Sequence, residues 1–205
     1  MIRAALRLAV MGACALALSG CISLLPKSKP AQLYRFGQSG ATAAAQPAPS
    51  ATVGVFQANG TFQGEAAGDR LLTINGGKAA FIAQSRWVAP AGVLFNEAVV
   101  SAFDADGGKV RLISRGQQGK SAYALRLDVR NFEARYESGP DSAPTVVVRV
   151  RAVLTNADLT KTAEQIFESR SKAANNRVGA IVEAYDKATS EVLGQVVGWT
   201  NTNAS

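Results

Sequence analysis

The clearest alternation of hydrophobic and polar residues lies in the second half of the chain, in residues 122–136 and 145–154. In residues 145–154 the even-numbered positions are valine, alanine or leucine, whereas arginines occupy odd-numbered positions. Alternation with a period of two predicts β-strands with one buried face. In residues 122–136 the hydrophobic positions change parity after Val129, which predicts a β-bulge near Asn131.

Six shorter segments also have the composition of strands, and one pair of them predicts a hairpin. Residues 71–74 and 79–83 are hydrophobic, and the sequence Asn-Gly-Gly starts directly after the first of them. Because asparagine and glycine tolerate positive φ, this spacing favours a tight hairpin turn. Residues 163–169 follow a polar break after residue 154, and we expect them to pair back as a further strand. The remaining strand predictions are residues 31–36, 52–57 and 109–115.

The first of these strands is separated from the others by residues 37–51, which consist of glycine, alanine, proline, serine, glutamine and threonine. This composition lacks apolar periodicity and predicts a flexible linker. A connection of this length is unusual within one domain, and it argues against placing residues 31–36 in the main sheet.

Two segments have hydrophobic residues spaced three and four apart, which predicts amphipathic helices. The first follows Pro90 and ends at the glycines after residue 106; Phe95, Val99, Ala102 and Phe103 form its stripe. The second runs from Val178 to Trp199, with Asn175 as its predicted N-cap. Half-polar strands with two such helices predict an α+β fold, a two-layer sandwich whose mostly antiparallel sheet carries two main helices packed on one face.

The N-terminus predicts secretion and lipid attachment. Residues 1–8 contain two arginines and no acid, and residues 8–18 are apolar, which is the layout of a secretory signal peptide and too short for a membrane span. The sequence Leu-Ser-Gly-Cys that ends at Cys21 resembles a bacterial lipobox. The resemblance implies cleavage between Gly20 and Cys21, a diacylglycerol on the Cys21 sulfur and acylation of the new amine. The alternatives are an ordinary signal peptide with an incidental cysteine, or a buried helix.

This interpretation divides the chain into a cleaved signal peptide (residues 1–20), a lipidated tether (21–30) and one domain (31–205) that includes the flexible segment 37–51. Residue 22 is isoleucine and not aspartate. In bacteria that sort lipoproteins by this position, aspartate favours retention in the inner membrane. The resemblance to such systems therefore implies the periplasmic face of the outer membrane.

Composition argues against several classes of function. The 205 residues include 22 Lys and Arg, 15 Asp and Glu and no histidine, for a formal charge of +7. Arg3 and Arg7 leave with the signal peptide, so the mature charge is 7 − 2 = +5. This mild excess suits anionic headgroups or an acidic partner, and dispersed basic residues do not predict nucleic-acid binding. The cysteines are Cys14 and Cys21, so the mature domain has no free thiol, and we expect no enzyme, no metal and no cofactor beyond the lipid.

A few motifs and side chains are candidates for function. The segment Gly116–Ser121 resembles part of a phosphate loop but lacks the earlier glycine and a following helix, and Ser169 with Lys172 forms a single S-x-x-K match. Trp87 and Trp199 are interpreted as core aromatics or, alternatively, as interface anchors. Arg126 and Arg149, with neighbouring arginines at 130 and 151, are interpreted as a solvated sheet face or as a strip that faces a partner.

Five segments, in their order along the chain, together resemble the ABC-type transport auxiliary lipoproteins, the PqiC-like (YmbA-like) family. They are residues 33–36 (LYRF), 83–88 (AQSRWV), 125–132 (LRLDVRNF), 150–154 (VRAVL) followed by Phe167, and 182–189 (VEAYDKAT) running to Trp199. The resemblance covers nearly the whole mature chain, although segment 37–51 is longer than the family pattern. This departure puts the pairing of the first strand in question.

The resemblance implies a non-enzymatic role beside an MCE-type ABC transporter that moves lipids between membranes. Its implied partners are the MCE-domain protein, the ABC transporter subunits and the membrane, with lipid contact and a homo-oligomer left open. Two other functions stay open: a stand-alone periplasmic lipid carrier with an apolar cleft, and an assembly lipoprotein for an outer-membrane β-barrel. The lipid and the direction of transport are not predicted.

Overall fold

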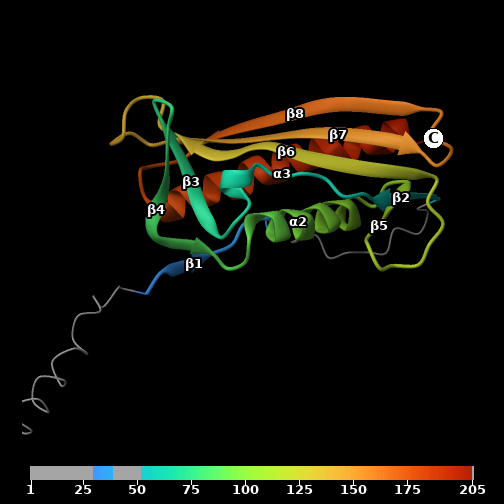
Figure 1. Cartoon of the computed structure of the whole chain (residues 1–205), viewed down its shortest axis with the longest axis horizontal. Helices are drawn as coiled ribbons and strands as arrows, with labels where there is room; N and C mark the ends of the chain where they lie inside the picture. Colours follow the sequence, from blue (N-terminus) through green and yellow to red (C-terminus); the bar gives the residue numbers. More distant parts are fainter. Residues whose placement is uncertain (1–29, 39–51, 205) are drawn as a thin grey trace, which may run out of the picture. The chain divides into compact units, whose positions relative to one another are not determined.

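The computed structural model describes residues 30–38 and 52–204 (Figure 1). The predicted signal peptide, Cys21 with the tether up to residue 29, and residues 39–51 of the predicted flexible segment lie outside the described residues. Ala31–Ser205 forms one compact unit. Within the described ranges, no helix combines the length and the apolar character that a membrane crossing requires.

The three longest strands lie side by side: β6 (Tyr123–Arg135), β7 (Thr145–Asn156) and β8 (Thr162–Lys172), which is an edge strand of the sheet. They pair antiparallel along almost their whole length, which confirms the strands predicted from the alternating pattern. The register of β6 against β7 shifts between Val129 and Asn131, so Arg130 is the extra residue of a bulge. The predicted bulge is therefore confirmed, and it returns Phe132 and Ala134 to the buried face.

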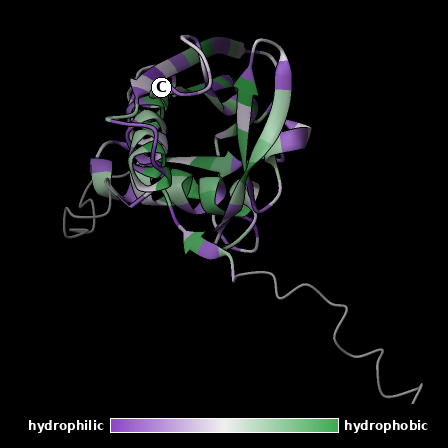
Figure 2. Ribbon diagram, turned by 90° about the vertical axis from the view of Figure 1, so that its left-hand side faces the viewer, coloured by the Kyte–Doolittle hydropathy of each residue, from purple (hydrophilic) through white to green (hydrophobic). Residues whose placement is uncertain are grey.

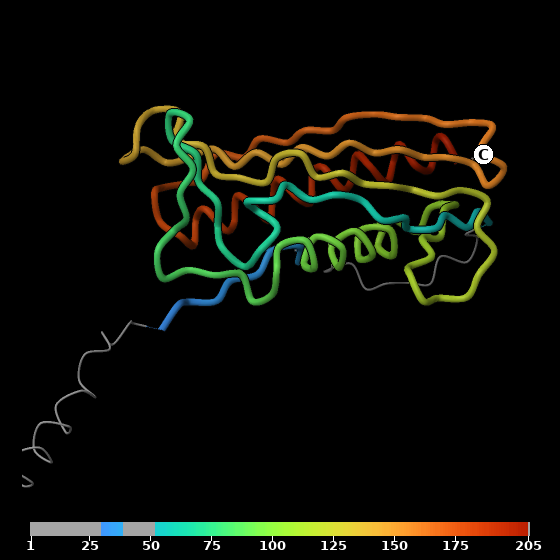
Figure 3. The backbone as a smooth tube through the Cα atoms, viewed as in Figure 1, coloured from blue at the N-terminus to red at the C-terminus, as the bar shows by residue number. Residues whose placement is uncertain are grey.

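The other edge of β6 is shared by two strands. β2 (Val53–Gln57) pairs parallel with the beginning of β6, and β3 (Arg70–Asn75) pairs parallel with its end. Between them, residues 58–63 follow β6, as the tube in Figure 3 shows. Gly60 lies so close to β6 that a Cβ atom there would be 1.8 Å from the Leu127 carbonyl oxygen. This approach requires glycine.

The remaining strands extend the sheet outward from β3 and β2. β3 forms the predicted hairpin with β4 (Lys78–Trp87), and the turn residues Gly76 and Gly77 have φ values of 52° and 81°. β5 (Val110–Ile113) pairs parallel with β2.

β1 (Gln32–Tyr34) pairs parallel with β4, so the first strand belongs to the sheet and the argument against it was wrong. The reason is that the entropy cost of closing a loop rises only slowly with its length. Burial of Phe36, which is 2% exposed, holds this segment in the core.

Two helices pack on the sheet, α2 (Ala91–Asp106) and α3 (Val178–Asn203); a short 3₁₀ helix, η2 (Gly64–Ala66), precedes β3. α2 begins after Pro90 and ends at Gly107, whose φ of 63° is left-handed, as predicted. The predicted cap at Asn175 is wrong: the N-cap is Arg177, without a side-chain cap bond. The neighbouring Asn176 amide instead donates to the Pro140 carbonyl oxygen. The α+β prediction is confirmed, with a mixed, mostly antiparallel eight-stranded sheet.

The core is centred on an aromatic cluster. The Phe132 ring lies 4.8 Å from Tyr185, 4.9 Å from Phe36, 5.3 Å from Phe62 and 6.4 Å from Trp87, measured between centroids. One side chain of β6 therefore contacts rings from β4, α3 and two connecting segments. Seen along the long strands, the sheet and both helices surround the interior of the domain (Figure 2). Buried hydrophobic side chains fill this interior.

The segment after β1 is fixed between the two helices. Gly37 has a φ of +82°, and an added Cβ atom would lie 2.7 Å from that of Ala98 in α2. The N–H groups of Gly37 and Gln38 donate to the Asp186 carboxylate of α3 at 2.6 and 3.0 Å. The first two residues of the segment predicted to be flexible are thus held by α3.

Candidate functional site

The two tryptophans occupy different environments. Trp87 is 2% exposed and packs edge-on against Phe36 and Tyr185, so its indole offers no surface to a partner. Trp199 is half-buried on α3 and packs edge-on against Phe167 of β8 at 5.9 Å. Of the two, only Trp199 keeps part of its surface for a partner.

Arg126 and Arg149 lie on the face of the sheet that points away from the helices. Arg126 is opposite Val153 and Arg149 is opposite Asn131, so the two arginines lie in separate rows of the sheet. Each lies near a carboxylate: Arg126 is 3.4 Å from Asp128, and Arg149 is 3.7 Å from Glu168. This face therefore presents a lattice of paired charges, and Trp199 is on the opposite side of the sheet.

Asp128 is the buried centre of that lattice. Its carboxylate accepts hydrogen bonds from the Thr61 N–H and hydroxyl at 3.0 and 3.1 Å, and Arg151 lies 3.5 Å away. Burial alone would raise the pKa of Asp128, but the Thr61 bonds and the positive charges of Arg126 and Arg130 outweigh burial and lower the pKa. The ionised carboxylate thus ties residues 58–63 to β6 and β7.

Replacing Asp128 with asparagine is expected to lower the free energy of unfolding by about 1–3 kcal/mol at pH 7. The reason is that the neutral amide removes the negative charge that Arg126 and Arg151 face, and its NH₂ group cannot accept a hydrogen bond from Thr61. A pKa lowered in the folded state stabilises the protein above the ordinary value of 3.8. That stabilisation disappears as the pH falls below this value through the lowered one. Urea denaturation between pH 2.5 and 7 should therefore show that the free energy of unfolding falls less steeply with falling pH in Asp128→Asn than in the wild type.

The exposed Asp104 at the end of α2 provides the matched control for this prediction. Asp104→Asn should keep the wild-type pH profile and change stability by less than about 0.5 kcal/mol. Coincident profiles for Asp128→Asn and the wild type would contradict the role assigned to Asp128.

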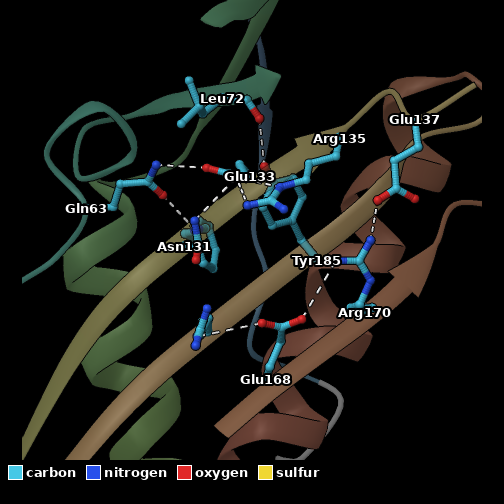
Figure 4. A network of polar contacts seen from close by, with 11 residues as sticks. Gln63, Leu72, Asn131, Glu133, Arg135, Glu137, Glu168, Arg170 and Tyr185 are labelled. Carbon is cyan, nitrogen blue, oxygen red and sulfur yellow. Dashed lines mark hydrogen bonds and ion pairs between the residues drawn. The ribbon is translucent and has the colours of Figure 1, made fainter. Parts of the chain in front are cut away.

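A second buried carboxylate, Glu133, lies near the end of β6 (Figure 4). It accepts hydrogen bonds from the Gln63 amide at 2.8 Å and from Arg135 Nε at 2.7 Å. The Gln63 carbonyl oxygen in turn accepts the Phe132 N–H at 2.8 Å. Both side-chain groups of Gln63 therefore attach the connection before η2 to β6, which makes this network structural.

A cleft of about 240 Å³ lies between α2 and residues 57–62, and we call it the α2 cleft. Its buried floor is apolar and consists of Phe95, Leu127 and Val129, with Phe62 half-buried beside them. Its rim carries amides and one cation: the half-buried Gln57 and the exposed Asn59, Asn96 and Arg115. Such an arrangement can bind a group with an apolar part and a polar or anionic end.

The rim is held by two polar contacts. Gln57 donates to the Asn96 side-chain carbonyl at 3.3 Å, and the Arg115 guanidinium donates to the Asn59 side-chain carbonyl. No carboxylate lines the cleft, and within the described part of the chain Arg115 forms no ion pair. The electrostatic character of the rim is therefore positive.

Sequence reasoning did not find the α2 cleft. Its residues come from segment 57–62, Ala67, the start of α2, the connection after β5 and the middle of β6, and no motif in these stretches predicts a binding site. The one available signal is Gly92, a glycine in the first turn of a helix, where it lowers helix propensity.

The fold is shared with solved structures. A protein of Xanthomonas campestris from the family DUF330 superimposes with a TM-score of 0.71 and 22% identity, covering 84% of this chain and 95% of that one. An uncharacterised protein superimposes with a TM-score of 0.65 and 11% identity, covering 83% and 99%. Comparison with curated proteins gave no match. The chain therefore shares the α+β fold of these two structures. A shared fold by itself defines no activity.

The sequence family is more specific than the fold. The model of the ABC-type transport auxiliary lipoprotein component matches residues 68–197, which is more than half of the chain. The chain therefore belongs to this family, as the five ordered segments predicted. It is an auxiliary lipoprotein component of ABC-type transport, anchored to a membrane in the cell envelope.

Proposed function

We propose that this chain is a periplasmic lipoprotein of the outer membrane that assists an MCE-type ABC system in moving lipids between membranes, without catalysing a reaction. The observation that carries the proposal is the family match over residues 68–197. The lipobox that ends at Cys21 supports the anchor, and isoleucine at position 22 supports the outer membrane.

The length of the tether supports a role close to a membrane. Ten residues lie between Cys21 and Gln32, the first residue of β1, so eleven Cα–Cα steps join the two. A chain spans at most about 3.3–3.6 Å per residue, so this connection reaches no further than roughly 40 Å. A lipid on Cys21 would keep the domain within that distance of the bilayer surface, where it can meet a membrane-spanning assembly.

The geometry of the motifs supports a non-catalytic role. Ser169 faces α3 and donates to Glu191 at 2.6 Å, whereas Lys172 is exposed on the other face of β8. The S-x-x-K match therefore does not place the two side chains together. Residues 116–121 connect two strands, without the helix that a phosphate loop requires.

Affinity purification tests the proposal directly. The tagged chain, purified from its own cells in mild detergent, should recover an MCE-domain protein or an ABC transporter subunit. Recovery of an outer-membrane β-barrel as the main partner would favour the assembly role. Recovery of phospholipid by native mass spectrometry, with no protein partner, would favour the stand-alone carrier. Either of these last two results would overturn the proposal.

Arg126 and Arg149 remain the proposed partner-facing cations. Replacing both with glutamine should lower recovery of the transporter subunit roughly tenfold, the factor for a loss of about 1.4 kcal/mol. Both arginine side chains are 45% exposed, and the buried Asp128 keeps its Thr61 and Arg151 contacts without Arg126, so the free energy of unfolding should fall by no more than about 1–2 kcal/mol. Lys78→Gln, an exposed change on the β3–β4 hairpin, is the control and should recover wild-type amounts. Equal recovery from all three chains would exclude this face.

A further inference from the structure

We propose that the α2 cleft binds a single-chain amphiphile with an anionic head, a carboxylate or a phosphate, whose apolar chain enters the cleft while the head stays at Arg115. The inference needs only the domain and does not depend on the lipid anchor or on a transport partner. It goes beyond the auxiliary role, because it assigns a ligand class to a site of this chain.

The floor of the cleft specifies the apolar part of the ligand. Phe95, Leu127 and Val129 are buried and offer no hydrogen-bonding side-chain group. Val93 is 47% exposed on the α2 side, so an apolar surface continues from the floor to the mouth. An alkyl chain would cover this surface, whereas a sugar or a nucleotide would leave its polar groups without partners there.

The rim specifies the charge of the ligand. Arg115 holds only the neutral Asn59 carbonyl, and no carboxylate of the described residues lines the cleft or neutralises this guanidinium. By contrast, Arg126 and Arg151 on the sheet face lie beside carboxylates. An anionic head at the mouth would give Arg115 the charge-assisted partner that it lacks in the fold.

The volume specifies the size of the ligand. The cleft holds about 240 Å³, whereas sites that enclose drug-sized ligands hold about 300–1,000 Å³. At about 30 Å³ for each water-sized group, this is room for roughly eight groups. The cleft therefore has room for one short alkyl chain, or the first part of a longer one, and not for two chains side by side.

Gly92 offers a way to fill the cleft. A Cβ atom at Gly92 would lie 3.8 Å from the Phe62 ring, which is ordinary contact. Gly92→Leu therefore places a side chain into the space that the ligand needs. Gly194→Leu is the matched control, because Gly194 is also helical and has no atoms within 4 Å of an added Cβ.

Arg115 tests the charge. Arg115→Gln removes the cation at the mouth and keeps hydrogen-bonding capacity. Lys120→Gln removes a cation from the same connection between β5 and β6 but not from the cleft lining, and is the matched control.

The measurement is an NMR titration of the chain that begins at residue 22, which retains the whole compact unit Ala31–Ser205. The ligands are octanoate, octyl phosphate and uncharged 1-octanol. Octanoate or octyl phosphate should shift the amide signals of Gly92, Asn96 and Arg115 and bind at least tenfold more tightly than 1-octanol. A stronger response to octanoate indicates a fatty acid as the source of the head; a stronger response to octyl phosphate indicates a lysolipid.

The variants and a chain-length series complete the test. Arg115→Gln should reduce octanoate binding to that of 1-octanol, and Gly92→Leu should abolish it, while both controls bind as the wild type. Affinity should rise roughly fourfold per methylene up to about eight carbons and then level off. If Gly92→Leu fails to fold, Gly92→Ala replaces it and should weaken binding roughly fourfold, the equivalent of one methylene.

Three results would overturn the inference. They are shifts that do not map to the cleft, equal affinity for octanoate and 1-octanol, and unchanged affinity after filling the cleft at Gly92.

Discussion

Replacing Phe132 with alanine is expected to lower the free energy of unfolding by about 3–5 kcal/mol, the usual cost of removing a buried phenylalanine ring. Phe132 is 1% exposed and its ring contacts Phe36, Phe62, Trp87 and Tyr185. A cavity at this point loosens β4, α3 and the segment after β1 together. For a domain whose stability is about 5–15 kcal/mol, this is a large fraction of the total.

Urea denaturation followed by tryptophan fluorescence measures this change, because Trp87 lies within the cluster. Phe81→Ala is the control: Phe81 is only half-buried on the β3–β4 hairpin, where the Arg70 guanidinium lies 4.0 Å from its ring centroid. Its loss should be below about 2 kcal/mol, since a fully buried side chain contributes about 1.5–3 kcal/mol by transfer alone. Equal losses in the two variants would show that Phe132 is not the centre of the core.

Replacing Cys21 with serine is expected to abolish lipid attachment and release the chain from the membrane fraction. A lipobox implies acyl chains on both the sulfur and the new amine. Each buried methylene contributes about 0.8 kcal/mol to membrane binding, so several chains anchor a protein stably, whereas a chain without lipid keeps no such attachment. The expected result is complete loss of labelled palmitate and a shift of the protein into the periplasmic fraction.

Cys14→Ser is the matched control, because Cys14 is the one other cysteine of the sequence and belongs to the predicted signal peptide. This variant should incorporate palmitate and fractionate as the wild type does. Palmitate on the Cys21→Ser chain, or membrane attachment that survives without it, would contradict the assignment of Cys21.

Local patterns were enough to predict most of the elements of this fold. The long ladders of β6 to β8, the bulge at Arg130 and the left-handed end of α2 each depend on a few neighbouring residues. The arrangement of the short strands was not predictable in the same way. β2 and β3 share one edge of β6 because of contacts between distant residues. β1 pairs with β4 although a long connection separates β1 from the next strand.

The candidate site shows the same limit more strongly. Asp128 alternates with arginines along β6, a pattern typical of a solvated sheet face, but residues 58–63 cover it. These residues can follow β6 so closely only because residue 60 is glycine. The α2 cleft is formed by several stretches of chain that are far apart in the sequence, so no local sequence pattern predicts it. Trp87, by contrast, lies in the core, which was the first of its two interpretations.

The way in which the chain enters the fold has a mechanical consequence. Any tension that a membrane anchor transmits reaches the domain first at β1, whose three residues pair with β4. Behind them, Phe36 is buried among Trp87 and Phe132, and the next N–H groups are bound to Asp186. Tension on β1 is therefore transmitted directly to β4, and detaching the chain beyond β1 requires the buried Phe36 ring to leave the core. The attachment point of the anchor is thus coupled to the centre of the domain.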